Sequence, residues 1–252
     1  MSTDNPKLVI ITGATSGFGK ACAIKFAKNG WQIIATGRRL DRLRTLQNEI
    51  GTEICEIRSF DVNNAAAVNQ FSDSLKGRKI DLLINNAGLA LGISPAHQAD
   101  FEDWETMIET NILALTRMTR SILPIMVENK NGHIINLGSI AGSYPYPGAN
   151  VYGATKAFVE QFSLNLRADL SGTGVRVTNI EPGLANTEFS KVRFHGDKDK
   201  ADSIYQGLEP LVAEDIAESI YWCASQPKHV NINRLEIMPT CQAFGPLSIH
   251  KN

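Results

Sequence analysis

Short apolar runs alternate along this chain with stretches in which apolar residues recur every three or four positions. Seven of the runs predict β-strands, at residues 7–13, 31–37, 53–62, 81–88, 132–139, 175–183 and 234–239. The amphipathic stretches predict helices at residues 17–29, 39–50, 64–77, 103–129, 152–171 and 213–225. Several runs are apolar nearly throughout, which is typical of a parallel sheet with helices on both faces. We therefore expect an α/β fold, a doubly wound sheet of about seven parallel strands in a single domain spanning residues 1–252.

One stretch departs from this alternation. Residues 187–207 are charged, contain Gly196 and separate the sixth predicted strand from the next helix. Loops of this length inside a compact domain are often lids over a site. We therefore expect a substrate lid here, and the alternative is a disordered surface loop.

The composition narrows the possible functions. The 252-residue chain has a net charge of −1 and a pI near 6.5, so no overall basic excess is available to bind nucleic acid or an anionic membrane. Four cysteines are scattered without metal-ligand spacing, which argues against a disulfide framework and predicts no metal site: Cys22, Cys55, Cys223 and Cys241. The opening residues MSTDNPK lack the blocks of a signal peptide, and no apolar run approaches the ~18 residues that span a bilayer. We therefore expect a cytoplasmic protein.

The first predicted strand runs directly into a glycine-rich turn and a helix. The glycines permit a tight turn, close approach of the backbone to a pyrophosphate, and packing of the helix on the strand. The helix N-terminus supplies aligned N–H groups and a partial positive charge. A glycine triplet is weak evidence by itself, but this one has the strand and the helix that the motif requires. The predicted dinucleotide contacts are Gly13, Thr15, Ser16, Gly17, Phe18 and Gly19.

The second predicted strand ends in Gly37, Arg38 and Arg39, at the place where NAD-binding proteins hold the ribose 2′-hydroxyl with a carboxylate. Two guanidinium groups would instead attract a 2′-phosphate and bond it in a fork. The pattern therefore predicts NADP as the cofactor, and solvated surface arginines are the alternative.

Tyr152 and Lys156 are four positions apart, so on a helix they lie on one face about one turn from each other. Such a pair arises often by chance, and a surface pair is the ordinary explanation. Here, however, five motifs stand in order along one alternating chain: TGATSGFG, NNAG at 85–88, Ser139, YGATK and PG at 182–183. In this order they resemble the short-chain dehydrogenase/reductase family over essentially the whole chain, which implies a Rossmann-type fold.

The resemblance implies roles for individual residues. Ser139, Tyr152, Lys156 and Asn111 would form the catalytic set, with Asn111 helping to hold Lys156, usually through water. A homotetramer is also expected of the family, with residues 103–129 and 152–171 as contact faces. The implied cofactor contacts beyond the phosphate loop are Asp61 and Val62 at the adenine, Asn86, Tyr152 and Lys156, and then Pro182, Gly183 and Thr187 at the nicotinamide end.

The same resemblance gives the tyrosine–lysine pair a chemical purpose. A free phenol has a pKa of about 10 and is a poor base at neutral pH. An ammonium at Lys156 and a positive nicotinamide ring would favour the phenolate of Tyr152 and lower its pKa. Tyr152 would then take the proton of an alcohol while hydride leaves carbon for the cofactor, or act in reverse on a carbonyl. Ser139 would hydrogen-bond the substrate oxygen as charge develops.

The segments NNAGLALG, SIAGSYPYPG, EPGLANTEFSKVRF and NINRLEIMP most resemble the NADP-dependent 3-hydroxy acid dehydrogenases. These act on serine, allo-threonine, 3-hydroxyisobutyrate or 3-hydroxypropionate and its malonic semialdehyde. Sulfoacetaldehyde reductases are similar and stay an alternative, although they carry an arginine near the position of Cys241. Arg193, between two apolar residues of the expected lid, would close over the substrate carboxylate. Tyr144 and Tyr146 would wall the pocket, either by packing or by polar contacts.

Two other classes of function fit the fold. Some proteins of this fold bind NADP(H) as a regulatory signal without turnover, but they usually lack an intact Ser–Tyr–Lys set. A purely structural or partner-binding role would leave the phosphate glycines and Arg38 unexplained. We therefore predict an NADP-dependent oxidoreductase that acts on a small molecule carrying a carboxylate.

Overall fold

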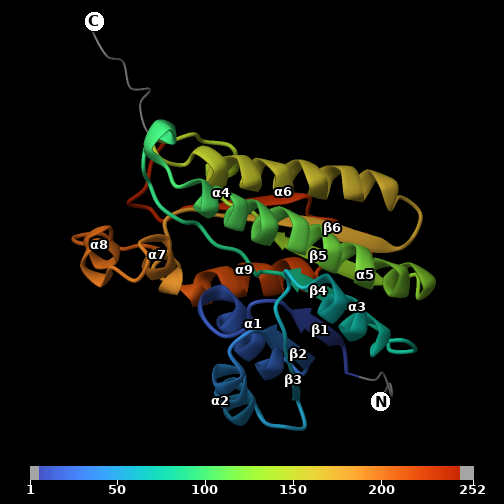
Figure 1. Cartoon of the computed structure of the whole chain (residues 1–252). Coiled ribbons are helices and arrows are strands. Elements are labelled where there is room, and N and C mark those ends of the chain that lie inside the picture. Colours follow the sequence, from blue (N-terminus) through green and yellow to red (C-terminus); the bar gives the residue numbers. More distant parts are fainter. Residues whose placement is uncertain (1–5, 245–252) are drawn as a thin grey trace, which may run out of the picture.

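A seven-stranded parallel sheet runs through the computed structural model of the protein, which describes residues 6–244 (Figure 1). Residues 1–5, within the segment where we predicted no signal peptide, and residues 245–252 lie outside the described residues. The strands are β1 (Leu8–Ile11), β2 (Gln32–Gly37), β3 (Cys55–Ser59), β4 (Leu82–Asn85), β5 (Gly132–Leu137), β6 (Val175–Pro182) and β7 (Arg234–Ile237). The predicted fold class is confirmed. Each strand is shorter than its predicted run. At β1, β4 and β5 the run continues into a turn that carries site residues.

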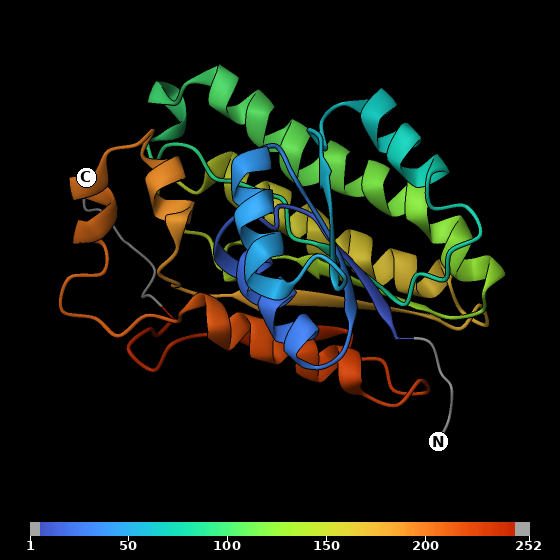
Figure 2. The ribbon, with the colours of Figure 1, turned by 90° about the horizontal axis from the view of Figure 1, so that it is seen from below.

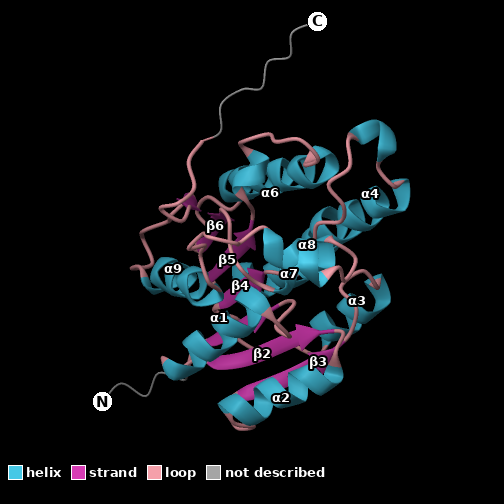
Figure 3. Cartoon of the chain, turned by 90° about the vertical axis from the view of Figure 1, so that its left-hand side faces the viewer, coloured by secondary structure: helices cyan, strands magenta, loops and turns pink. Residues whose placement is uncertain are grey.

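Helices cover both faces of the sheet (Figure 3). One face carries α1 (Gly17–Lys28), α2 (Leu40–Ile50) and α9 (Ala213–Ser225); the other carries α3 (Ala65–Asp73), α4 (Phe101–Ile108), α5 (Leu115–Glu128) and α6 (Asn150–Asp169). In β1, Val9 and Ile11 pack with the first group of helices, whereas Leu8 and Ile10 pack with the second. Since successive side chains of a strand point to opposite faces, a strand covered on both sides is apolar throughout.

The direction of the strand order reverses at β1. The order is β3-β2-β1-β4-β5-β6-β7, so β1 pairs with β2 on one side and β4 on the other. In open parallel sheets, ligands bind at such a point, in the crevice outside the carboxyl ends of the strands. The turns after β1 and β4 meet there, which brings the phosphate loop beside the NNAG turn.

The long helix predicted at 103–129 contains a widened turn. α4 ends at Ile108, a π-helical segment covers Glu109–Ala114, and α5 follows directly. Asn111, in the widened turn, is 1% exposed, and its side chain bonds both backbone groups of Leu89. Segments of this kind inside α-helices are frequent at functional sites.

Residues 187–207 are not an irregular loop, and this part of the prediction is wrong. They fold into α7 (Glu188–Arg193) and α8 (Lys198–Ser203). The Thr187 hydroxyl accepts a hydrogen bond from the backbone N–H of Phe189, and the Asp197 carboxylate accepts one from that of Lys200. These caps satisfy N–H groups that a helix start leaves unpaired. Both helices, orange in Figures 1 and 2, lie together at one end of the molecule.

Within residues 6–244, no helix is long and apolar enough to cross a bilayer. The same residues hold no cluster of His, Cys, Asp and Glu side chains suited to a metal ion. Their four cysteines are free thiols, of which Cys22, Cys55 and Cys223 are buried and Cys241 is exposed.

Candidate active site

The turn between β1 and α1 is built for an anion. Gly13 and Gly17 have φ values of +66° and +50°, in the left-handed region that favours glycine. A Cβ atom at Gly19 would clash with the carbonyl oxygen of Gly13, so helix and loop pack closely only with glycine there. Helix α1 begins at Gly17, and its first turn lies at the crevice. The N–H groups of this turn and the positive end of the helix dipole favour a bound anion there.

The NNAG turn after β4 is tied to this loop. The Asn86 side chain donates hydrogen bonds to the carbonyl oxygens of Thr12 (2.8 Å) and Gly13 (3.1 Å). The Asn85 side chain donates to Thr119 at 2.8 Å and to Asn136 of β5 at 2.9 Å. The turn therefore holds the phosphate loop and the centre of the sheet in one arrangement.

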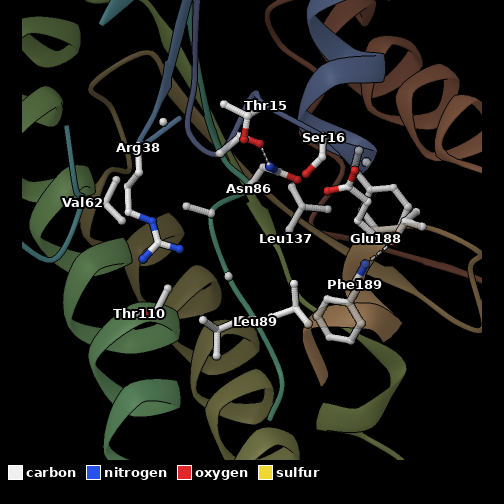
Figure 4. Close-up of a pocket in the computed structure, with 18 of the residues that line it drawn as sticks. Thr15, Ser16, Arg38, Val62, Asn86, Leu89, Thr110, Leu137, Glu188 and Phe189 are labelled. Atoms are coloured by element: carbon white, nitrogen blue, oxygen red, sulfur yellow. Dashed lines mark hydrogen bonds between the residues drawn. The ribbon is translucent and has the colours of Figure 1, made fainter. Parts of the chain in front are cut away.

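A cavity of about 300 Å³ lies in this crevice and gathers most of the predicted cofactor contacts (Figure 4). Gly19 is the exception in the phosphate loop, because it packs beneath the loop and does not line the cavity. Pro182 and Gly183 line an adjacent cavity. The predicted contacts that line the first cavity are Gly13, Thr15, Ser16, Gly17, Phe18, Arg38, Arg39, Asp61, Val62, Asn86, Tyr152, Lys156 and Thr187.

The two predicted arginines have different surroundings. Arg38 is 69% exposed at the cavity rim, with its guanidinium 3.8 Å from Asp61. Arg39 donates to the hydroxyls of Thr15 (2.7 Å) and Ser16 (2.9 Å), so it also braces the phosphate loop. Both line the cavity, as expected of cations that meet a phosphate.

Sequence reasoning missed a second contact of Arg39. Its Nη1 lies 3.3 Å from the carboxylate of Glu188, the first residue of α7, and Arg42 binds the same carboxylate at 2.7 Å. Figure 4 shows Glu188 and Ser16 around the same opening. Arg42 lies in the first turn of α2, three residues after Arg39, which is a usable sequence signal, but nothing local to Glu188 pointed to this contact.

The tyrosine and the lysine lie one turn apart on α6, as their spacing predicts, and each is 7% exposed. The Lys156 ammonium donates to the carbonyl oxygen of Leu137 at 2.7 Å and lies 5.8 Å from the centre of the Tyr152 ring. Ser139 follows β5 and starts a short 3₁₀ turn, in which its hydroxyl accepts from the N–H of Ala141. Three of the four predicted catalytic side chains therefore lie in one region, at the end of β5 and on α6.

Tyr152 stands between two cavities. With Lys156 it lines the first, and with Ser139 it lines a second cavity of about 320 Å³. Phe189 of α7 lines both cavities and packs on the Tyr152 ring at 5.7 Å. A cofactor in one cavity and a substrate in the other would therefore meet at the phenol.

Burial dominates the acid–base properties of the pair. It raises the pKa of Tyr152 to about 12, although the neighbouring Ser139 hydroxyl and Arg193 guanidinium act to lower it. Burial also lowers the pKa of Lys156 to about 8. The predicted lowering of this pKa needs the positive nicotinamide ring together with Lys156, and it stays a prediction for the complex. In the protein alone, desolvation outweighs the nearby charges.

Asn111 supports the catalytic helix from the side. Its amide donates to the carbonyl oxygen of Leu89 (2.8 Å) and to the hydroxyl of Thr155 (3.0 Å). Its own oxygen accepts from the N–H of Leu89 at 2.9 Å. Asn111 thus connects the segment after the NNAG turn to the residue that precedes Lys156.

Arg193, at the end of α7, lines the second cavity with Ser139 and Tyr152. Its Nε donates to the carbonyl oxygen of Gly92 (3.2 Å), and its Nη1 donates to the hydroxyl of Tyr146 (3.1 Å). The guanidinium lies over the rings of Tyr146 and Tyr152, at 5.5 and 5.7 Å from their centres. Its Nη2 is buried and meets no hydrogen-bond partner among residues 6–244. A buried donor without a partner is costly, so this guanidinium is suited to an anion.

The two tyrosines of the YPYPG segment, Tyr144 and Tyr146, have different surroundings. Tyr146 lines the second cavity, whereas the hydroxyl of Tyr144 lies 3.4 Å from Glu236 and its ring packs on Phe244. Sequence reasoning missed other lining residues, which come from segments far apart in the chain: Ser190, Ile204, Tyr205 and Gln242.

Three comparisons show which known proteins this chain is similar to. A model of the short chain dehydrogenase family matches residues 7–198. The NADP-dependent 3-hydroxy acid dehydrogenase of Salmonella typhi is 56% identical over 248 residues, which cover 97% of this chain and 100% of that protein. The serine 3-dehydrogenase of Rhizobium radiobacter is 51% identical over 245 residues, covering 96% of this chain and 98% of that protein.

Among solved structures, the closed form of serine dehydrogenase complexed with NADP⁺ superimposes with a TM-score of 0.95. That chain is 55% identical, and the match covers 97% of this chain and 100% of the other. The family match spans well over half of the chain, and the identity extends over nearly all of it. The protein therefore belongs to the short-chain dehydrogenase family, as the order of its motifs predicted.

Proposed function

We propose that this protein is an NADP-dependent oxidoreductase that interconverts a short 3-hydroxy acid and the corresponding 3-oxo acid. The observation that carries the proposal is Arg193. Its guanidinium shares a cavity with Ser139 and Tyr152, and one of its buried donors has no hydrogen-bond partner within the described part of the chain. A carboxylate would satisfy that donor and place a hydroxyl two carbons away near the phenol. The similarity to a 3-hydroxy acid dehydrogenase and a serine 3-dehydrogenase supports the same substrate class.

The residues around the first cavity fit NADP. The tight glycine turn and the N-terminus of α1 suit a pyrophosphate, and the arginines after β2 suit a 2′-phosphate. When bound, NADP supplies the nicotinamide carbon that accepts or returns a hydride. The proposed contacts are Arg38 and Arg39 to the 2′-phosphate, Asp61 and Val62 to the adenine, Lys156 to the nicotinamide ribose, and Pro182, Gly183 and Thr187 to the nicotinamide end.

Tyr152 moves the proton. It gives a proton to the substrate oxygen during reduction and takes the hydroxyl proton during oxidation, while the hydride moves to or from the substrate carbon. With a pKa raised to about 12 by burial, the phenol is protonated at neutral pH, which is the form that reduction needs. During oxidation, the Lys156 ammonium and the positive charge of the oxidised cofactor stabilise the phenolate. Ser139 hydrogen-bonds the substrate oxygen.

We also propose that α7 and α8 form a substrate lid. Residues of α7 line both cavities: Glu188, Phe189 and Val192 the first, and Ser190 and Arg193 the second. A lid of this kind would exclude water and bring Arg193 over the substrate.

A homotetramer in the cytoplasm is the proposed state of the protein. One contact face would be the continuous stretch of α4, the π-helical segment and α5, and the other would be α6. Apolar side chains there are 38–47% exposed: Leu113 in the π-helical segment, and Phe158 and Leu164 on α6. Exposed apolar surface of this kind is typical of interaction sites. Free thiols at all four cysteines agree with a reducing compartment.

A substrate panel tests the function. Serine, allo-threonine, 3-hydroxyisobutyrate, isethionate and a neutral secondary alcohol would each be offered with NADP⁺ while the absorbance of NADPH is followed. We expect the highest kcat/KM with one of the carboxylates. A preference for isethionate would instead favour a sulfoacetaldehyde reductase, and no turnover of any alcohol would favour a binding protein without catalysis.

Replacing Arg193 with alanine is expected to raise KM for a 3-hydroxy acid by about 30-fold or more. A bidentate contact between a guanidinium and a carboxylate under a closed lid contributes on the order of 2–4 kcal/mol, and each 1.4 kcal/mol is about tenfold in affinity. Arg193→Lys should recover only part of this, because an ammonium cannot reproduce the fork.

Lys191→Ala is a matched control for Arg193→Ala, because Lys191 lies on the same short helix with an exposed side chain. It should leave KM unchanged. Activity of Arg193→Ala on a neutral alcohol should also hardly change. If both substrate classes suffered equally, Arg193 would hold α7 in place through Gly92, and another group would bind the carboxylate.

A further inference from the structure

The edge strand β7 presents two charged side chains to the segment that carries Ser139 and Tyr146. Since strand side chains alternate between faces, Arg234 and Glu236 lie on the same face of β7. The guanidinium of Arg234 reaches the hydroxyl of Ser143 at 2.5 Å, and the hydroxyl of Tyr144 lies 3.4 Å from the Glu236 carboxylate. Neither Arg234 nor Glu236 lines either of the two cavities described above. The functional site described above therefore gives no role to Arg234, the last residue of the segment NINR at 231–234.

Arg234 is fixed by partners on three sides. Its Nε donates to Glu181 of β6 at 2.6 Å, its Nη1 to Glu160 of α6 at 2.8 Å, and its Nη2 to Ser143. Glu181 is only 1% exposed, and a buried carboxylate needs a counter-ion held in good geometry. The planar guanidinium fork can meet several acceptors at once, which an ammonium cannot. Arg234 is thus held relative to β6 and α6, and it holds Ser143 in turn.

Ser143 lies at the centre of the segment that shapes the second cavity. The 3₁₀ turn Ile140–Gly142 begins at Ser139 and ends at Ser143, whose N–H donates to the carbonyl oxygen of Ile140 at 3.0 Å. Glu160 also accepts from the Ser143 hydroxyl, at 3.3 Å. Three residues later, the Tyr146 hydroxyl accepts from Arg193. A shift at Ser143 would therefore move Ser139 on one side and the partner of Arg193 on the other.

We propose that Arg234 is a positioning residue for substrate recognition, acting through Ser143 on the segment from Ser139 to Tyr146. It touches neither substrate nor cofactor. Arg234 positions the Ser139 hydroxyl, which binds the substrate oxygen. It also positions the Tyr146 phenol, which orients the Arg193 guanidinium. This inference rests on the proposed function, because it assigns Ser139 and Arg193 to substrate binding.

The test compares variants that remove one contact at a time. Ser143→Ala keeps the pair of Arg234 and Glu181 but removes the hydroxyl, and Arg234→Lys keeps the charge but loses the fork. Each should raise KM for the substrate by about five- to tenfold, the size of one ordinary hydrogen bond, with kcat within about twofold of wild type. The double variant should be no worse than the poorer single variant, since both act on one contact. Ser143→Thr, which keeps a hydroxyl, should have the same KM as the wild-type protein.

Cofactor affinity and stability separate positioning from a merely structural role. The Kd for NADPH, measured by fluorescence, and the Tm of Ser143→Ala should match those of wild type. An unchanged KM in either single variant would overturn the proposal. A KM that rose only together with a lower Tm and weaker NADPH binding would also overturn the proposal. Arg234 would then have the structural role of neutralising Glu181 at the edge of the sheet.

The substrate for this test is whichever alcohol of the panel the wild-type protein oxidises fastest. If that alcohol is not a 3-hydroxy acid, the proposed function fails, but the comparison of the Ser143 and Arg234 variants still decides the positioning role. The two proposals can therefore fail separately.

Discussion

Replacing Tyr152 with phenylalanine is expected to lower turnover by about 10²–10⁴-fold, the usual scale for a positioned acid–base group. The change removes only the hydroxyl. The Tyr152 ring packs on Phe189 and lies beneath the charges of Lys156 and Arg193, and a phenylalanine ring can keep these contacts. We therefore expect the Tm and the Kd for NADPH to stay near the wild-type values while kcat falls.

Tyr221→Phe is the matched control for this prediction. Tyr221 lies on α9, packs on Phe26 and lines neither cavity, so the loss of its hydroxyl should leave kcat unchanged. Near-normal turnover in the Tyr152 variant would remove the phenol from the mechanism and leave the protein without its proposed acid and base.

The pH dependence gives a second view of the same group. In the protein without cofactor, burial is the main cause that raises the pKa of Tyr152 to about 12, so the phenolate is scarce at neutral pH. Alcohol oxidation needs that phenolate, and its rate should rise with pH and level off below about 10, because the oxidised cofactor adds a positive charge beside the phenol. Reduction needs the protonated phenol. Because the reduced nicotinamide carries no positive charge, the rate of reduction should fall only at a higher pH than that at which the rate of oxidation levels off. A rate of oxidation that did not change with pH would contradict this role, as would the same rise in Tyr152→Phe.

Replacing Arg38 and Arg39 together with alanine is expected to weaken NADP binding far more than NAD binding. Each charged hydrogen bond to a phosphate contributes about 1.5–3 kcal/mol, which is roughly tenfold to a hundredfold in Kd. The structure also distinguishes the two residues. Arg38 is exposed at the rim, so Arg38→Ala should affect NADP alone. Arg39 braces Thr15 and Ser16, so Arg39→Ala should weaken NAD as well.

Fluorescence titration of NADPH and NADH against each variant measures these effects. Arg44→Ala is the matched control, because Arg44 lies on the same helix with an exposed side chain and lines neither cavity. Its affinities should equal those of the wild type. If the wild-type protein used NAD as efficiently as NADP, the assignment of the two arginines to a 2′-phosphate would be wrong.

The sequence by itself predicted the features that depend on near neighbours in the chain. The apolar run at β1 predicted a strand buried on both faces, and Val9 and Leu8 do face opposite helical layers. The spacing of Tyr152 and Lys156 predicted one helical face, and α6 carries both there. These predictions succeed because strand and helix periods are fixed by the backbone, so four to ten consecutive residues are enough to reveal them.

Other features required the tertiary structure. Arg193 was a candidate from its neighbours alone, but its contacts with Gly92 and Tyr146 bring together residues 101 and 47 positions apart. The contact of Arg42 with Glu188 spans 146 positions. No local pattern encodes which distant side chains meet, because that depends on how complete helices and loops pack around the sheet.

The same reason explains the errors. Charge and a glycine made residues 187–207 resemble a loop, but caps at Thr187 and Asp197 and packing over the cavities fold them into α7 and α8. The pKa of Tyr152 followed burial, which chain spacing does not reveal. The sequence determined the strands, the phosphate loop and the catalytic helix face through local backbone geometry. Only the packing of distant segments decided the surroundings of Arg193 and the desolvation of Tyr152, because both depend on contacts between residues that are far apart in the chain.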